Sequence, residues 1–566
     1  ITEKRVYRDP LGEQIQSKAP PILTREQEAA VRTIGKAVGH GFDTFLLAGV
    51  TGSGKTEVYL RLAQATLEQG LAVLILVPEI SLISQMERRF RSRFGERVAV
   101  LHSGLSAGEK LDQWQKIMNH EFEIAIGARS AVFAPFERIG LIIVDEEHDT
   151  SYKQEGDLRY NARDIAVVRA QQQNAVALLG SATPSIQSYH NTMDGKYQLV
   201  HLTKRVEQQT LPEILIVDLC QSRDQKGWRR YFSKELMDAL RETMARNEQA
   251  ILFLNRRGFA NFPVCGSCGK AIQCKNCDIT LTFHQKYNAY KCHYCGFAIS
   301  AASPCPSCGS TKIHHLGVGT EKIESTVQKL FPDKTVQRMD RDTTTRKGAI
   351  VNMLKGLKGR EIDILVGTQM VTKGHDFPGI TLVGIICADL SLSFPDFRAG
   401  ERTFQLLAQV AGRAGRGQTP GRVILQTYNP DHFSIRCAQH QDFHDFYQKE
   451  IGSRKALDYP PFSRMVQIKI SSRDQSKGRR QAEIMGGLAR NIIQSPPLFR
   501  KTIHVFGPLE SPLSRIATRY RWQMLFKGLR LSPLREFIQQ LLHDSQADRS
   551  RRDVTIAVDV DPFFMM

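Results

Sequence analysis

The chain has 566 residues, of which 41% are hydrophobic and 24% charged, as is typical of a folded protein with three or four domains. It contains neither a signal peptide nor an apolar run of about 18 residues, so we expect no membrane partner. The net charge of +19 favours a polyanionic partner, usually nucleic acid, over general solubility. Because the chain opens at Ile1 and lacks an initiator Met, we expect an N-terminal part to precede it.

A phosphate-binding loop is predicted near the start of the chain. Residues 1–20 read as a polar linker, and an apolar run at 45–47 then leads into GVTGSGKT and a helical stretch. In this strand–loop–helix context the pattern predicts backbone amides that wrap the phosphates of ATP. Lys55 is expected to reach the β- and γ-phosphates and Thr56 to bind Mg²⁺. The predicted loop residues are Gly49, Val50, Thr51, Gly52, Ser53, Gly54, Lys55 and Thr56.

The second half of the nucleotide site is predicted where another apolar strand ends in acids. Residues 141–144 read LIIV and run into Asp145, Glu146, Glu147 and His148. We expect Asp145 to hold Mg²⁺ and Glu146 to polarise the attacking water. An acidic solvated turn is the alternative, and the buried character of the preceding strand argues against it.

Eight of the eleven cysteines form four Cys-x-x-Cys pairs. In a cytosolic chain this pattern indicates metal binding rather than disulfides. Four thiolates hold one Zn²⁺, so we predict two structural zinc sites with ligands Cys265, Cys268, Cys274, Cys277, Cys292, Cys295, Cys305 and Cys308. The pairing stays open, although a nested arrangement with the two middle pairs as the inner site suits the spacing. His284 and His293 are possible ligands, but two complete cysteine sets leave them no position.

The acidic segment resembles the DEAH-type box of superfamily 2 helicases, and further blocks follow in that superfamily's order. These blocks are Gln27 in LTREQ, VPEISL (77–82), GARSA (127–131), GSATPS (180–185), LFLNRRGFA (252–260), GTQMVTKGHDFP (367–378) and QVAGRAGR (409–416). LFLNRRGFA directly before the cysteine pairs and GVGTEKIE (317–324) after them resemble the PriA family of bacterial primosomal helicases. The resemblance extends from Pro21 to Pro562.

The resemblance implies an α/β fold with two RecA-like parallel-sheet lobes, a two-zinc insertion and a small α/β C-terminal domain. The expected divisions are lobe 1 at 21–207, lobe 2 at 208–262 and 312–448, the zinc module at 263–311 and the C-terminal domain at 449–566. Gln27 then corresponds to a base-reading glutamine, and Arg413 and Arg416 to arginines that reach the γ-phosphate. The family's N-terminal DNA-binding region does not fit into the residues before Pro21.

Two segments are predicted to contact DNA. Residues 151–164 resemble an aromatic-rich loop that senses single-stranded DNA, with candidates Tyr152, Lys153, Arg159, Tyr160 and Arg163. Packing of both tyrosines at a lobe interface is an equally weighted alternative. Near the C-terminus, basic residues alternate with aromatic ones, and we favour DNA contact by Arg521 and Trp522 over a core tryptophan and a solvated arginine face.

The resemblance implies an ATP-dependent 3′→5′ DNA helicase that acts at stalled replication forks and initiates primosome assembly. The implied partners are single-stranded and forked DNA, single-stranded-DNA-binding protein and other primosome proteins. We expect a monomer in the bacterial cytoplasm, associated with the nucleoid. Three alternatives stay open: a double-strand DNA translocase, a DNA-bound scaffold whose ATPase is secondary, and, with less support, an RNA helicase.

Overall fold

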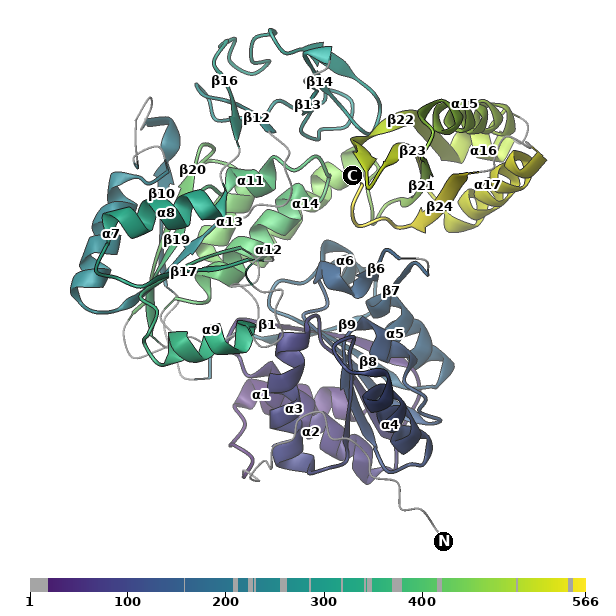
Figure 1. The fold of residues 1–566 in the computed structure, drawn as a ribbon. Helices are drawn as coiled ribbons and strands as arrows, with labels where there is room; N and C mark the ends of the chain where they lie inside the picture. Colours follow the sequence, from purple (N-terminus) through teal and green to yellow (C-terminus); the bar gives the residue numbers. More distant parts are fainter. Residues whose placement is uncertain are drawn as a thin grey trace. The chain divides into compact units, whose positions relative to one another are not determined.

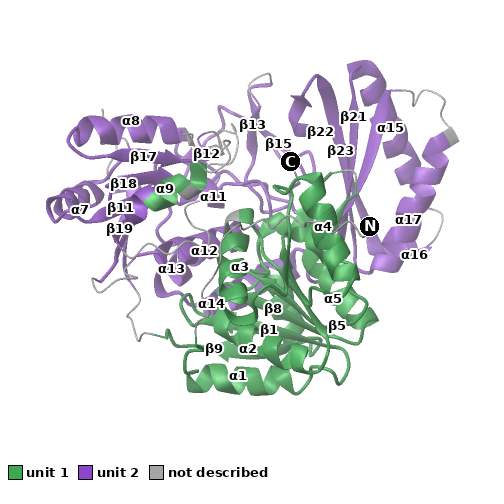
Figure 2. Ribbon diagram, turned by 60° about the horizontal axis from the view of Figure 1, so that its bottom comes forward, with its two compact units in different colours: residues 1–211, 347–355, 373–376 green, residues 212–346, 356–372, 377–566 purple. Residues whose placement is uncertain are grey.

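The structure is a computed structural model and describes residues 19–156, 158–206, 212–221, 228, 231–254, 262–284, 287–316, 319–340, 343, 349–368, 379–414, 420–494, 497–547 and 553–565. It divides into two compact units (Figure 2). Unit 1 comprises residues 1–211, 347–355 and 373–376, and unit 2 comprises 212–346, 356–372 and 377–566. Among the described residues, no helix is both long and apolar enough to cross a membrane.

Unit 1 is built on a seven-stranded sheet in the order β3-β4-β2-β5-β8-β1-β9, and every strand pair in it is parallel. The central strands are rich in Val, Ile and Leu and buried along their length, as expected of a parallel sheet covered on both faces. The strands are β1 (Asp43–Gly49), β2 (Ala72–Leu76), β3 (Val98–Leu101), β4 (Ile124–Gly127), β5 (Ile139–Asp145), β8 (Val176–Ser181) and β9 (Gln198–Leu202).

Helices flank the sheet on both sides (Figure 1). The chain moves along the sheet in one direction from β1 to β3 and returns from β3 to β8. Right-handed crossovers therefore place α2 and α3 on one face and α4 and α5 on the other. The helices are α1 (Arg25–Gly35), α2 (Lys55–Glu68), α3 (Ile80–Phe94), α4 (Ala107–Met118), α5 (Ala162–Gln172) and α6 (Ile186–Met193). Short elements in the same unit are η1 (Arg129–Phe133), η2 (Thr150–Tyr152), β6 (Lys153–Gln154) and β7 (Tyr160–Asn161).

Unit 2 contains a second parallel sheet, in the order β10-β20-β19-β11-β18-β17. Its strands are β10 (Glu213–Asp218), β11 (Gln249–Phe253), β17 (Val336–Met339), β18 (Ile364–Gly367), β19 (Ile380–Ile385) and β20 (Arg422–Thr427). Its helical elements are η3 (Leu219–Gln221), α7 (Lys234–Ala245), α8 (Thr320–Leu330), α9 (Ala349–Lys358, divided between the units), α11 (Asp389–Leu392), α12 (Ala399–Ala411), α13 (Phe433–His440) and α14 (Phe443–Ala456). The two parallel sheets confirm the predicted two-lobe α/β class.

Two smaller parts complete unit 2. The cysteine-rich segment forms the sheets β12 (Phe262–Cys265) with β16 (Ile313–Leu316), and β13 (Thr282–His284), β14 (Ala289–Lys291) and β15 (Ala298–Ser300). The C-terminal part is an antiparallel sheet with helices against one face, in the order β22-β23-β21-β24. Its elements are β21 (Arg464–Ser472), α15 (Gln475–Ile492), α16 (Pro497–Thr502), β22 (Ile503–Ile516), β23 (Arg519–Gly528), α17 (Leu531–Asp544), η6 (Ser545–Ala547) and β24 (Val554–Val560).

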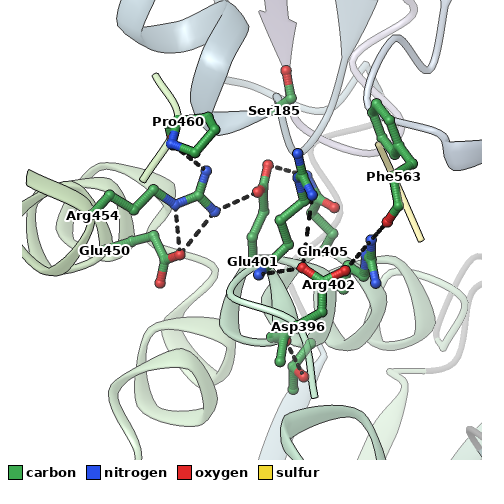
Figure 3. A network of polar contacts seen from close by, with 12 residues as sticks. Ser185, Asp396, Glu401, Arg402, Gln405, Glu450, Arg454, Pro460 and Phe563 are labelled. Carbon is green, nitrogen blue, oxygen red and sulfur yellow. Dashed lines mark hydrogen bonds and ion pairs between the residues drawn. The ribbon is translucent and has the colours of Figure 1, made fainter. Parts of the chain in front are cut away.

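A buried ion-pair network anchors α12 within unit 2 (Figure 3). Arg454 of α14 lies 2.6 Å from Glu401 of α12 and 2.8 Å from Glu450, and all three side chains are less than a tenth exposed. Its Nη1 also donates to the Pro460 carbonyl oxygen at 3.3 Å. Arg402 pairs with Asp396 at 3.1 Å and donates to the Phe563 carbonyl oxygen, so the final residues are fastened to the same helix.

We predict that Arg454→Met lowers the free energy of unfolding of unit 2 by about 3–5 kcal/mol, because it leaves two buried carboxylates without their cation. The matched control is Arg436→Met. Arg436 also lies 2.8 Å from its partner, Asp431, but that pair is exposed, so the loss should stay below about 1 kcal/mol. Urea denaturation followed by circular dichroism measures both. Equal shifts of the two midpoints would contradict the assigned role of burial.

Candidate functional site

The predicted phosphate-binding loop joins β1 to α2. Gly52 and Gly54 have φ angles of +85° and +77°, left-handed conformations that suit glycine because it lacks a Cβ. Nζ of Lys55 donates to the Gly49 carbonyl oxygen at 2.8 Å, so the ammonium lies over the loop. The hydroxyl of Thr56 accepts from Nη1 of Arg89 at 3.1 Å. Free amides at a helix N-terminus together with an ammonium provide the electrostatics that phosphates require.

Gln27 packs directly against this loop. Its side chain is 3% exposed, and Nε2 donates to the Ser53 carbonyl oxygen at 2.9 Å. A Cβ on Gly54 would lie 2.3 Å from that Nε2, so close approach as well as φ requires glycine there. The neighbouring Glu26, which the sequence analysis missed, accepts the Thr203 amide at 2.7 Å. This pair of residues in α1 thus contacts both the loop and the segment that follows β9.

Asp145 ends β5 and lies in register with Gly180 of β8. Its Oδ1 accepts a hydrogen bond from the Tyr59 hydroxyl at 2.9 Å, a contact that the sequence analysis did not anticipate. Burial, and secondly the Glu146 carboxylate, raise the pKa of Asp145 to about 6, while Lys55 and the Tyr59 bond act in the opposite direction. A carboxylate in such a position gains from a bound cation, and Asp145 therefore fits the predicted Mg²⁺ site.

Glu146 and His148 follow on the turn after β5. Glu146 has a φ of +48°, an uncommon conformation for a residue other than glycine and one that is frequent at functional sites. His148 is 9% exposed, and its Nδ1 lies 2.7 Å from the Ser181 hydroxyl and 3.7 Å from the Glu146 carboxylate. The acidic turn is thereby connected to the end of β8, where GSATPS begins.

Glu147 is the most enclosed of the four residues in the acidic turn, at 2% exposure. Its carboxylate accepts the Ser185 amide at 2.6 Å, the Ser188 hydroxyl at 2.8 Å and Nη1 of Arg163 at 3.1 Å. Arg163 is 6% exposed and pairs with this acid, so its side chain is occupied inside the lobe. The structure therefore corrects the expectation that Arg163 contacts DNA.

The aromatic-rich segment is divided between the interior and the surface. Tyr152 is 1% exposed, and its hydroxyl donates to the Asp145 carbonyl oxygen at 2.5 Å; Lys153 is 6% exposed. A buried ring offers no face to a base, and a buried lysine side chain does not present its ammonium to a phosphate. The structure therefore corrects the DNA-contact expectation for these two residues. Arg159 and Tyr160 are half-buried and stay predictions. The Tyr160 ring lies edge-on to Phe133, 5.2 Å between centroids, and the sequence analysis missed this exposed aromatic neighbour.

Trp522 belongs to the core of the C-terminal part and not to its surface. It is 5% exposed, and a Cβ on Gly478 of α15 would lie 2.2 Å from its ring. This corrects the expectation that Trp522 stacks on DNA. The alternation of Trp522, Met524 and Phe526 along β23 was the available signal, because period two places all three on the helix-covered face. Arg521 points to the opposite face, and its DNA contact stays a prediction.

Of the two predicted arginine fingers, the structure describes one. Arg413 lies two residues after the end of α12 and is 7% exposed. Arg416 lies outside the described residues. The γ-phosphate contact therefore stays a prediction for both arginines.

The eight cysteines gather into two sets of four, in the nested arrangement. Cys274, Cys277, Cys292 and Cys295 form the inner set, and Cys265, Cys268, Cys305 and Cys308 the outer set. Sulfur–sulfur distances of 3.5–3.8 Å, measured for Cys265–Cys308 and Cys268–Cys305, suit thiolates around one Zn²⁺. The residue after each pair has a φ between +51° and +80°, a region that Gly and Asp adopt more readily than most residues: Gly269, Asp278, Gly296 and Gly309.

His284 and His293 belong to neither cysteine set. Their Nε2 atoms lie 3.0 Å apart, so one ring donates to the other. The inner set is more deeply embedded, because the Tyr459 hydroxyl donates to the Cys277 carbonyl oxygen at 2.9 Å and the Tyr459 ring stacks on Phe397 at 4.5 Å. The inner zinc site therefore packs against Tyr459, which follows α14 and stacks on Phe397 just before α12.

We predict that the two zinc sites empty independently. Cys274→Ser and Cys305→Ser should each reduce bound zinc from about two ions per chain to about one, because each removes one ligand from a different set. Cys274→Ser should also lower the thermal midpoint more, because the inner set has three buried cysteines and the outer set has two. Elemental analysis and thermal melting measure both, and Cys437→Ser is the control outside either set. Loss of both ions in either variant would contradict independence.

Profiles of three protein families match the chain. The DEAD/DEAH box helicase family matches residues 24–192, the Cys-rich region of PriA DNA helicase matches 274–299, and the primosomal protein N C-terminal domain matches 455–563. Among solved structures, RecG bound to a three-way DNA junction aligns over 78% of this chain and 51% of its own, with 18% identity and a TM-score of 0.45.

Curated relatives match over almost the entire chain. The replication restart protein PriA of Bacillus subtilis is 43% identical over 565 residues, which are 100% of this chain and 69% of that protein. The protein of the same name from Treponema pallidum is 40% identical, over 95% of this chain and 80% of its own. That of Haemophilus influenzae is 38% identical, over 99% and 76%. Identity of this extent, together with the two cysteine sets inserted between β11 and β17 of the second parallel sheet, makes the chain a member of the PriA family of replication restart proteins.

Proposed function

We propose that the chain is an ATP-dependent DNA helicase that unwinds DNA in the 3′→5′ direction at stalled forks and initiates primosome assembly. The carrying observation is that Gln27, the phosphate-binding loop and Asp145 meet at one end of the unit 1 sheet. Membership in the PriA family supports DNA as the substrate, and the net charge of +19 is consistent with a polyanion. Direction and primosome assembly rest on the family resemblance alone.

In the proposed mechanism, ATP binds with its phosphates on the amides of the loop and on Lys55, and Gln27 contacts the base. Thr56 and Asp145 would hold Mg²⁺, which neutralises the phosphate charge when bound. Glu146 orients and polarises the attacking water. Arg413 and Arg416 stabilise the charge that develops on the transferring phosphoryl group. Together these groups supply positioning and electrostatics, which are most of what phosphoryl transfer needs.

A helicase has to couple ATP hydrolysis to DNA binding. We propose that the connection is Glu147 with its partners Arg163, Ser185 and Ser188. Arg163, which pairs with Glu147, lies in the first turn of α5, the helix that follows the segment with Arg159 and Tyr160. A change in that segment on DNA binding would therefore reach the acidic turn through one ion pair. The exposed Phe133 and its half-buried neighbour Tyr160 are suited to contact bases.

The partners that we propose are single-stranded and forked DNA, single-stranded-DNA-binding protein and other primosome proteins. The proposed setting is the bacterial cytoplasm at the nucleoid, with the chain acting as a monomer. A double-strand translocase shares every motor residue named above and is the second candidate. A DNA-bound scaffold with a secondary ATPase is the third, and the intact set of Lys55, Asp145 and Glu146 weighs against it.

We predict that the chain separates a duplex with a 3′ single-stranded tail faster than one with a 5′ tail, and that Glu146→Gln lowers this rate about 100-fold or more. The amide keeps the shape of the side chain but cannot polarise water as a carboxylate does. Glu137→Gln is the control, because the Glu137 side chain is 78% exposed. A gel-based strand-separation assay measures the rates.

Three outcomes of that assay would contradict the proposal in different ways. Equal rates on the two tails would contradict the direction. Displacement of a triplex-forming strand without duplex separation would favour the translocase. ATP-independent binding of forked DNA, with neither activity, would favour the scaffold.

A further inference from the structure

The hydroxyl of Tyr59 is a buried polar group next to the nucleotide site that the mechanism above does not use. Tyr59 lies on α2 one helical turn after Lys55, and its side chain is 0% exposed. Its hydroxyl donates to Oδ1 of Asp145 at 2.9 Å. A phenol is protonated at neutral pH and can therefore donate this hydrogen bond.

Gly180 provides the space for this hydroxyl. A Cβ at Gly180 would lie 1.8 Å from the Tyr59 oxygen and 2.9 Å from Cζ, distances that no side chain tolerates. Gly180 is also the residue of β8 that pairs with Asp145 of β5. The helix after the phosphate-binding loop, the acidic strand and the first residue of GSATPS therefore meet at one hydroxyl group.

A second tyrosine hydroxyl reaches the same aspartate at a different atom. Tyr152 donates to the backbone carbonyl oxygen of Asp145 at 2.5 Å, and its oxygen lies 3.0 Å from the Leu76 carbonyl oxygen. Tyr152 therefore supports the main chain at the end of β5, whereas Tyr59 acts on the carboxylate. This difference between two buried phenols provides a matched pair of variants.

We propose that Tyr59 is a positioning residue for the metal ion of the nucleotide site. Its hydroxyl fixes the orientation of the Asp145 carboxylate, which would hold the Mg²⁺ that accompanies the nucleotide. Glycine at position 180 leaves room for the Tyr59 hydroxyl. This inference rests on the proposed function of Asp145. A hydrogen-bonded carboxylate is already oriented when the ion arrives, and removing such a partner costs about 10–100-fold in metal affinity.

The test is a Mg²⁺ titration of the full chain and of Tyr59→Phe with a fluorescent ADP analogue bound. Phenylalanine fills the space of the ring and removes only the donor. We expect the Mg²⁺ concentration at half of the fluorescence change to rise about tenfold, in line with the loss of one hydrogen bond to a charged group. Affinity for the analogue in EDTA should stay unchanged, because the loop and Lys55 are intact.

Tyr152→Phe is the control, and its Mg²⁺ midpoint should stay within about twofold of that of the parent chain. Gly180→Ala serves as a second variant that displaces the hydroxyl without removing it, and it should raise the midpoint as Tyr59→Phe does. Thermal melting by circular dichroism verifies that each variant is folded.

An unchanged midpoint in folded Tyr59→Phe would overturn the inference while leaving the proposed function intact. Equal rises in Tyr59→Phe and Tyr152→Phe would also overturn it, because they would indicate general loosening of β5. A parent chain whose nucleotide binding shows no response to Mg²⁺ would overturn the proposed metal site itself.

Discussion

The parallel pairing of β5, β8 and β1 is the constraint on which the candidate site depends. These three strands are neighbours in the sheet of unit 1, and their carboxyl ends lie at the same edge. Residues distant in sequence therefore meet there: Gly49 ends β1, Asp145 ends β5 and Ser181 ends β8. Burial of nearly every strand residue holds the register, and a shift by one residue would separate Asp145 from Gly180 and Tyr59.

In unit 2, the two zinc sites stabilise the inserted cysteine-rich segment. The inserted segment has only short strands, too few residues for a large hydrophobic core of its own, and four-cysteine zinc sites supply the missing stabilisation. Its inner site nevertheless shares a buried cluster with Tyr459, Met465 and Leu525, which come from the chain after α14. Cys265 and Cys305 of the outer set belong to the same cluster, so both sites join the insertion to the C-terminal part, while Cys308 is exposed.

Much of this organisation could be predicted from the sequence because its signals are local. Glycines at left-handed positions of the loop, acids at the end of an apolar run and paired cysteines followed by Gly or Asp each have a fixed spacing. The contacts of Tyr59, Glu26 and Glu147 could not be predicted, because each joins residues far apart in the chain through side chains of ordinary type. Trp522 was predicted to contact DNA from local composition, and Tyr152 and Arg163 from a resemblance to a DNA-sensing loop. Neither signal distinguishes a buried aromatic or an ion-paired arginine from an exposed one.

The measurement that tests the central claim most directly is ATP hydrolysis by the full chain with and without single-stranded DNA, in parallel with Glu146→Gln. A DNA-dependent motor predicts strong stimulation by single-stranded DNA in the parent chain and almost none in the variant. Hydrolysis that is unaffected by DNA, or that survives Glu146→Gln, would contradict the assignment of the acidic turn as the centre of a DNA-driven ATPase.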